Sequence, residues 1–183
     1  MLVKKPSHQS AFTLVELLIT LSIAGILITL AIPSFSHTLA KSKLRSQLQV
    51  LFSHHQLARS EAIKTNQRVT LCKSSSGTQC TSTSGWSDGW IIFSDQNLDK
   101  TINNNDRILL VQQPIASGLT LTYRGFGSHN YISYFSDGRS TTNGTFTLCN
   151  QYGSAEAKSV IISRTGRARM DNKTASGKAL NCS

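Results

Sequence analysis

The chain has 183 residues, 39% of them hydrophobic and 15% charged, which excludes a disordered polyelectrolyte and suits one folded domain with an added segment. Nineteen Lys and Arg residues against nine Asp and Glu residues give a formal net charge of +10. This excess favours an anionic partner, such as nucleic acid or an anionic surface, although solubility alone would also account for it.

The N-terminal segment combines a short basic stretch with a long apolar run. Lys4 and Lys5 precede residues 12–32, in which Glu16 is the only charged residue. A run of this length crosses a bilayer core of about 30 Å as a helix. An ordinary secretory signal would have a shorter apolar core followed by small residues, whereas Pro33 follows here. We therefore expect a membrane anchor that stays on the mature chain.

An amphipathic pattern continues beyond Pro33. Apolar residues recur there at spacings of three and four, with cations and amides between them: Leu44, Leu48, Leu51, Ala58 and Ala62. This period is typical of a helix with one buried face. We predict a single helix over residues 12–65, whose stripe after Pro33 packs against the rest of the chain.

Residues 66–183 have the composition of a β-rich head. β-branched and aromatic segments alternate with turn residues such as Asp88-Gly89 and Asp137-Gly138. Asn143-Gly144 predicts a hairpin between residues 139–142 and 145–149. The predicted fold class is α+β, with a long hydrophobic helix packed on two antiparallel sheets. Strands are expected at 68–72, 90–94, 107–112, 119–123, 131–135, 145–149 and 159–164.

Four cysteines stand in the head, at Cys72, Cys80, Cys149 and Cys182. They contain no C-x-x-C pair, and no cluster of histidines accompanies them, so a zinc site is not expected. An even number of cysteines behind an export segment predicts two disulfides. Three pairings are possible; we favour Cys72–Cys80 as a local loop and Cys149–Cys182 as a clamp on the C-terminal tail.

The C-terminal tail concentrates positive charge. Between residues 158 and 183 there is one acid, Asp171, against six basic residues: Lys158, Arg164, Arg167, Arg169, Lys173 and Lys178. Gly166 allows a sharp turn, and side chains two residues apart on an extended segment point the same way. The guanidiniums of Arg167 and Arg169 would therefore face one side, where each binds phosphate oxygens in pairs, and Arg164 would extend the patch.

Catalytic and metal-binding patterns are absent from the sequence. No G-x-S-x-G frames a serine, and His129 has no Ser or Cys nucleophile near it in sequence. The segment 95–106 has the acidic spacing of a calcium loop, but Lys100 replaces the required glycine and Asp106 the long bidentate Glu. We therefore expect no enzyme, no cofactor and no metal.

The segment Ala11-Phe12-Thr13-Leu14-Val15-Glu16-Leu17-Leu18 resembles the prepilin peptidase site of type IV pilins and type II secretion pseudopilins. The resemblance implies cleavage between Ala11 and Phe12, methylation of the new amine, and contact of Glu16 with the N-terminal amine of a neighbouring subunit. Most members have Gly where this chain has Ala11. A lone carboxylate in hydrocarbon needs such a partner, although Glu16 near the membrane interface would also be tolerated.

Three segments of the head resemble the FimT and pseudopilin H (GspH) group of minor pilins: residues 88–95, residues 135–149 and residues 161–169 with Gly166-Arg167-Ala168-Arg169. In that group the Gly-Arg-x-Arg motif marks FimT proteins that bind DNA during natural transformation (competence). The resemblance implies a leader at 1–11, a helix at 12–65 with 12–32 in the membrane and later in the filament core, and a head at 66–183.

The favoured function is a minor pilin of a type IV pilus that binds double-stranded DNA without sequence preference for uptake. The alternatives are a structural minor pilin that primes pilus assembly and a type II secretion pseudopilin. Implied partners are other major and minor pilins and the prepilin peptidase. The implied location is the inner membrane, spanned once with the head in the periplasm, and then the extracellular pilus.

Overall fold

The computed structural model describes residues 13–103, 105–150, 152 and 156–182. Ala11 and Phe12, and with them the expected cleavage site, lie outside the described residues. The chain divides into two compact units, Met1–Leu39 and Ala40–Ser183. One helix, α1 (Leu14–Thr65), runs through both, and the predicted helix of residues 12–65 agrees with it within the described part.

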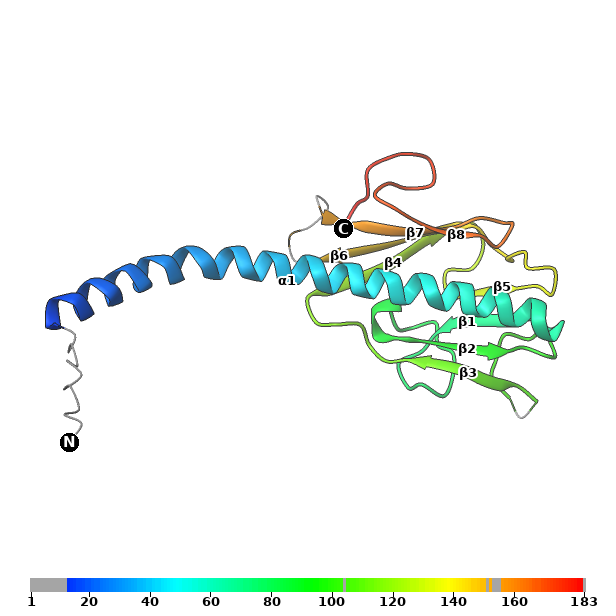
Figure 1. Ribbon diagram of the computed structural model, residues 1–183. Coiled ribbons are helices and arrows are strands. Elements are labelled where there is room, and N and C mark those ends of the chain that lie inside the picture. The colour runs from blue at the N-terminus through cyan, green and yellow to red at the C-terminus, as the bar shows by residue number, and fades with distance from the viewer. Residues whose placement is uncertain (1–12, 104, 151, 153–155, 183) are drawn as a thin grey trace, which may run out of the picture. The chain divides into compact units, whose positions relative to one another are not determined.

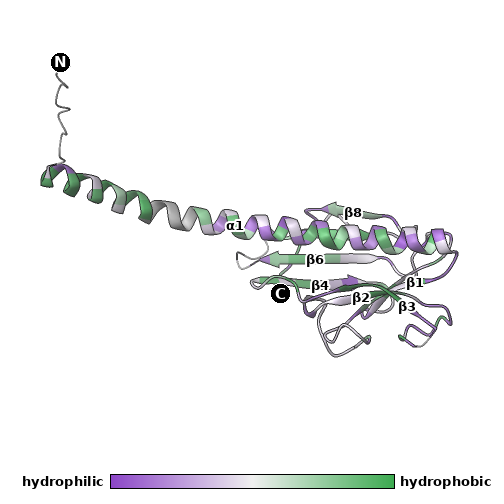
Figure 2. Cartoon of the chain, turned by 60° about the horizontal axis from the view of Figure 1, so that its bottom comes forward, coloured by the Kyte–Doolittle hydropathy of each residue, from purple (hydrophilic) through white to green (hydrophobic). Residues whose placement is uncertain are grey.

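In the first unit, α1 begins with a side-chain cap. The backbone N–H of Glu16 donates to Thr13 Oγ1 over 3.3 Å, which places the Glu16 carboxylate in the first turn, where the helix dipole favours an anion. Large exposed hydrophobic residues follow, and Figure 2 shows the first turns of the helix as mostly hydrophobic. Within the described residues, no helix reaches both the length and the mean hydropathy required of a membrane span.

The second unit is a helix packed on two sheets, each of four antiparallel strands (Figure 1). The first sheet has the order β3-β2-β1-β5 and the second the order β4-β6-β7-β8. The strands are β1 (Val69–Lys73), β2 (Trp90–Ser94), β3 (Arg107–Gln112), β4 (Leu119–Gly125), β5 (Tyr131–Tyr134), β6 (Gly144–Asn150), β7 (Lys158–Ile162) and β8 (Ala168–Asp171), with a short 3-10 helix η1 (Trp86–Asp88) before β2. The predicted fold class, a helix on two antiparallel sheets, is confirmed.

One core joins the helix to both sheets. The predicted stripe on α1, from Leu44 to Ala62, packs with Leu71 of β1 and Phe146 of β6 in a single cluster. His55 is fully buried in this interface, and its Nδ1 lies 2.9 Å from the hydroxyl of Tyr134. All buried hydrophobic side chains among the described residues belong to Ala40–Ser183, so this unit contains its own core.

One hairpin prediction was wrong, and one strand was missed. Residues 139–142 form no strand with β6; Ser140 makes only an isolated bridge with Tyr134, and β6 pairs with β4 and β7 instead. The Asn143-Gly144 sequence therefore leads into β6 rather than turning a hairpin. The strand β8 was not predicted at all, because Ala168–Asp171 looked like part of a loop. It pairs with β7 in antiparallel register, with Ile162 opposite Ala168 and Ile161 opposite Arg169.

Candidate nucleic-acid interface

The β7–β8 hairpin carries the arginines of the basic tail. The strands are joined by residues 163–167, in which the N–H of Ser163 donates to the carbonyl of Arg167 over 3.0 Å. The N–H of Gly166 donates back to the carbonyl of Ser163 over 2.9 Å. These two bonds close a tight turn. Arg164 and Arg167 therefore lie on the tip of the hairpin, and Arg169 lies on its second strand.

Gly166 fixes this tip against the rest of the head. Its φ is +75°, and a Cβ at this position would overlap the carbonyl oxygen of Gly138 in the loop between β5 and β6. The same carbonyl accepts a 2.9 Å hydrogen bond from Nε of Arg59 on α1. Hairpin tip, loop and helix thus meet at one point, which holds the arginines in a defined place rather than on a free tail.

Replacing Gly166 by Ala should lower the free energy of unfolding by roughly 2–4 kcal/mol, because a left-handed backbone conformation and a clash with backbone add together. Gly177→Ala is the matched control, since φ is +78° there but no atom lies within 4 Å of the added Cβ. The control should lose only the conformational part, roughly 1 kcal/mol. Urea unfolding of both variants measures the difference; equal losses would contradict the clash.

Arg167 and Arg169 come together as expected. Both line one hollow of about 280 Å³ together with Ile161 and Ser163. Arg169 has one acidic neighbour, because its Nε lies 3.6 Å from Oδ2 of Asp171, but its side chain remains 61% exposed. An exposed pair at this distance contributes little stability. Arg167 is exposed as well, so both guanidiniums are accessible to a phosphate.

Arg164 does not join them. It lines a separate hollow of about 270 Å³ with Arg139, Phe135 and Ser140. Arg139 itself pairs with Asp137, its Nε 2.6 Å from Oδ2. The Asp137 pKa is lowered, first by the hydrogen bond from the Arg139 backbone and then by the one from its side chain. The structure therefore divides the expected arginine patch into two neighbouring parts and adds Arg139, which sequence reasoning missed.

The three expected lysines are spread more widely. Nζ of Lys158 donates to Oδ1 of Asn172 over 2.7 Å. Lys173 is exposed, and its carbonyl accepts a hydrogen bond from Ser159 Oγ, which ties the start of the tail to β7. Lys178 lies farther along the tail and lines a hollow on the outer face of the second sheet. These lysines supply charge around the arginines without forming one compact cluster.

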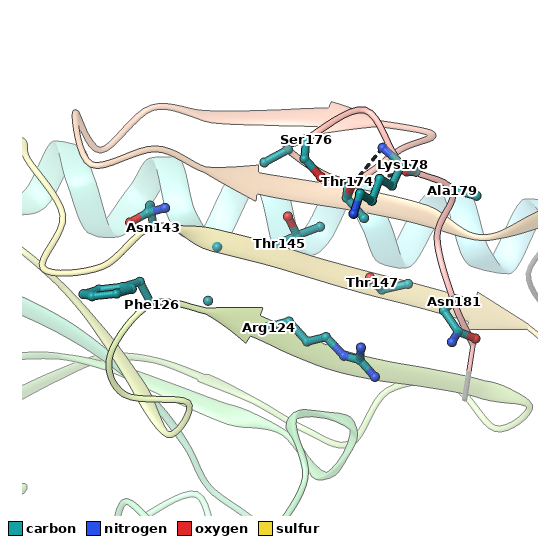
Figure 3. A pocket seen from close by; sticks show the side chains of 13 residues that line it. Arg124, Phe126, Asn143, Thr145, Thr147, Thr174, Ser176, Lys178, Ala179 and Asn181 are labelled. Carbon is teal, nitrogen blue, oxygen red and sulfur yellow. Dashed lines mark hydrogen bonds between the residues drawn. The ribbon is translucent and has the colours of Figure 1, made fainter.

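The hollow that Lys178 lines has a volume of about 550 Å³ (Figure 3). Its floor is β4 and β6, and the C-terminal tail forms one wall. Arg124 of β4 and Phe126 also line it. Sequence reasoning missed both residues. The alternation in Leu119–Gly125 does place Arg124 on the outer face, but only the tertiary fold brings the tail beside it.

Both disulfides have the pairing favoured from the sequence. Cys72 joins Cys80, and Cys149 joins Cys182 with a Cα–Cα distance of 5.9 Å. Each is part of a small apolar cluster apart from the main core; that of Cys149 contains Ala157 and Leu180. The second disulfide therefore clamps the end of the basic tail onto β6.

His54 and His55 of α1 contact residues of the core. Burial lowers the His55 pKa to about 3, with a smaller effect from neighbouring His54, so the imidazole is neutral near pH 7. Burial also lowers the pKa of His54, whose Nδ1 accepts a hydrogen bond from the Trp90 indole. Among the described residues no group of three His, Cys, Asp or Glu side chains is placed to hold a metal.

Comparisons with known proteins agree with the architecture. Residues 47–166 match the family model described as type II transport protein GspH, and residues 6–32 match the prokaryotic N-terminal methylation motif. No curated protein sequence matches the chain significantly.

Solved structures of pilins and pseudopilins share the fold. The type IV minor pilin FimU of Pseudomonas aeruginosa is 22% identical, with a TM-score of 0.59 over 78% of this chain and 96% of its own. The minor pseudopilin EpsH from the type II secretion system of Vibrio cholerae is 13% identical, with a TM-score of 0.51 over 70% of this chain and 96% of its own. At these identities the similarity establishes the fold. The family match ends at Gly166, so it contains neither Arg167 nor Arg169.

Proposed function

Because the chain belongs to the GspH family of pilin-like type II transport proteins, we propose that it is a minor pilin that binds double-stranded DNA without sequence preference during DNA uptake. One observation carries the DNA part of this proposal. Residues 158–183 contain six cations and one acid, and the fold presents every one of the cations at least partly to solvent. Since the family match stops before Arg167, this support comes from the chain's own residues.

The contacts in this proposal are to phosphates. Arg167 and Arg169 offer two guanidiniums in one hollow, and a guanidinium can bond two phosphate oxygens at once. The described part of the tail contains no aromatic side chain and no long strand or helix to enter a groove and read base edges. Binding is therefore weak, independent of sequence and sensitive to salt.

A mobility shift with the isolated unit Ala40–Ser183 tests the proposal, because this unit contains the whole described core and both disulfides. With about three phosphates contacted, log K should fall with log salt at a slope near −2.7. Affinity in the micromolar range would suffice, because several subunits of a filament engage one duplex together. No shift at low salt would overturn the DNA proposal.

A structural role is the second candidate, and the family match itself favours it. A minor pilin that primes pilus assembly, or a pseudopilin of a type II secretion system, needs the helix and the head but no DNA-binding surface. Under this alternative the basic tail serves solubility. Loss of piliation or of secretion in a deletion strain, combined with the absence of DNA binding at low salt, would select it.

The N-terminal segment is proposed to anchor the chain in the membrane and later to join it to neighbouring pilins. Before assembly, residues 12–32 anchor the chain once in the inner membrane with the head in the periplasm, an oxidising compartment that suits two disulfides. After processing by the prepilin peptidase, Glu16 pairs with the amine of Phe12 of a neighbouring pilin, and the head then lies on the extracellular pilus. Glu16 is exposed in the first turn of α1, which leaves its carboxylate open to such a contact.

The peptidase should cut after Ala11 and leave Phe12 as the mature N-terminus, because the basic leader ends where the apolar run begins. Intact mass of the membrane-extracted protein distinguishes this product from the uncut chain and reports methylation as an added 14 Da or so. Ala11→Gly, the residue more common in pilins, should be cut at least as fast. A mature N-terminus beyond Ile32 would contradict the pilin-type anchor.

A further inference from the structure

The outer face of the second sheet offers a binding surface beyond the arginine hairpin. The 550 Å³ hollow there lies between the C-terminal tail and the strands β4 and β6 (Figure 3). Its lining includes two cations, Arg124 from the sheet and Lys178 from the tail, and no carboxylate. Asparagine, threonine and serine side chains supply the rest of its polar surface. A hollow of this composition suits an anion with hydrogen-bonding groups.

Phe126 stands at one end of this hollow with its ring in solvent. At 76% exposure it is the most exposed large hydrophobic residue described in the unit Ala40–Ser183. Its backbone is nevertheless held on both sides: its N–H donates to the carbonyl of Asn143 over 2.9 Å, and its carbonyl accepts from Thr142 Oγ1. The fold thus presents a free aromatic face from a fixed position, which is what a stacking platform requires.

The wall that the C-terminal tail forms is also fixed. Lys178 donates its N–H to Thr174 Oγ1 over 3.1 Å, and its carbonyl accepts from the N–H of Thr174 over 2.9 Å. Leu180 is buried two residues later, and Cys182 is joined to Cys149. The backbone of the tail is therefore fixed beside the sheet, and Lys178 lines the hollow from that fixed position.

The hollow and the arginine hairpin share one face of the sheet. Arg124 is opposite Thr145, Thr145 is opposite Ile161, and Ile161 is opposite Arg169. Partners across antiparallel strands point to the same side, so Arg124 and Arg169 lie on one face, three strand spacings or about 14 Å apart. A DNA strand whose phosphates contact Arg169 therefore has to extend about 14 Å along this face to reach Arg124.

From this arrangement we propose that the hollow binds unpaired nucleotides at a DNA end, with a base stacked on Phe126 and the adjoining phosphates at Arg124 and Lys178. The inference deepens the proposed function and rests on it, since it places the end of a DNA molecule beside the duplex-binding arginines. Every base has a face that stacks on an aromatic ring, so this site is indifferent to sequence. It prefers an end with a single-stranded extension over a blunt end.

Three DNA ligands test this with the full chain in detergent: a blunt duplex, the same duplex with a short thymidine extension, and the same duplex with an abasic extension. The abasic ligand keeps the phosphates and removes the bases. The thymidine extension should tighten binding about fivefold, the lower end of what one stacked base contributes. The abasic extension should give a smaller gain, from charge alone. Phe126→Ala should abolish the difference between the two extensions, and Tyr152→Ala, another partly exposed aromatic residue, should preserve it.

A Phe126→Trp variant reports stacking directly. The two native tryptophans, Trp86 and Trp90, are 4% and 0% exposed, so the added indole is the only tryptophan open to a ligand in the described part of the chain. Its fluorescence should be quenched by the thymidine extension and not by the abasic one. Equal binding of all three ligands, or no selective quenching, would overturn the end-binding inference while duplex binding stands. Failure to bind blunt duplex with retained thymidine-selective quenching would overturn the duplex proposal alone.

Discussion

Replacing Arg167 and Arg169 together by Gln should weaken binding to duplex DNA at least tenfold at about 50 mM salt. The two guanidiniums share one hollow on the hairpin, so one DNA backbone reaches both. Each lost phosphate contact removes about 0.9 from the slope of log K against log salt, and the double variant should therefore have a slope smaller by about 1.8. A titration series at three or more salt concentrations measures both quantities.

The control for this variant carries the same change of charge elsewhere. Lys43→Gln with Arg45→Gln removes two exposed cations from α1 and should leave the DNA affinity within about twofold of the parent. Both double variants should unfold near the parent's temperature, because the replaced side chains are exposed and the ion pair of Arg169 with Asp171 is a surface contact that contributes little stability. If the two variants lose affinity equally, net charge rather than the hairpin binds the DNA. In cells, the Arg167 and Arg169 variant should lose transformation while pili still assemble.

The elements of the head were largely predictable because their signals are local. Trp90–Ser94 and Arg107–Gln112 have the bounds that their β-branched residues and flanking turns indicate. The stripe from Leu44 to Ala62 identified the buried side of α1 because a period of 3.6 residues reflects one helix face. Each of these predictions needed only neighbours in sequence.

The errors arose where distant partners decide the structure. Asn143-Gly144 is a strong hairpin signal, yet β6 pairs with β4 and β7, whose apolar faces join the core, so tertiary pairing outweighs the local turn preference. β8 was not predicted because it is an edge strand, and its residues Arg169 and Asp171 interrupt the alternation of apolar and polar residues that is typical of a strand with one buried face. Edge strands often carry charges, which discourage pairing with other chains.

In the candidate site too, local features were predictable and contacts between distant segments were not. The sequence identified the cations of the tail and their common side at Arg167 and Arg169. It did not identify Arg139 beside Arg164, nor Arg124 and Phe126 beside Lys178, because each pair joins segments from different parts of the chain. Composition counts charges, whereas only the fold decides which of them face one ligand.

The Cys149–Cys182 disulfide should matter for stability and for DNA binding alike. Replacing both cysteines by Ala frees a loop with a sequence separation of 33. The chain-entropy model then gives a loss of roughly 3–4 kcal/mol in the free energy of unfolding. The Cys72–Cys80 pair has a separation of 8, and its removal should cost less, roughly 2.5 kcal/mol. Urea unfolding of Ala40–Ser183 in both variants gives the two values.

DNA binding separates the two variants further. Without the clamp at Cys182, Leu180 loses its fixed place against Cys149 and Ala157, and the tail no longer holds Lys178 over the sheet. Affinity for DNA should therefore fall several-fold in the Cys149 and Cys182 variant. Without the disulfide the tail loses conformational entropy when it binds DNA, whereas the linked tail is already ordered. The Cys72 and Cys80 variant, whose disulfide lies on the other sheet, should bind as the parent does. Unchanged DNA affinity in the first variant would mean that the arginines of the β7–β8 hairpin act alone, because Gly166 holds that hairpin independently of the tail.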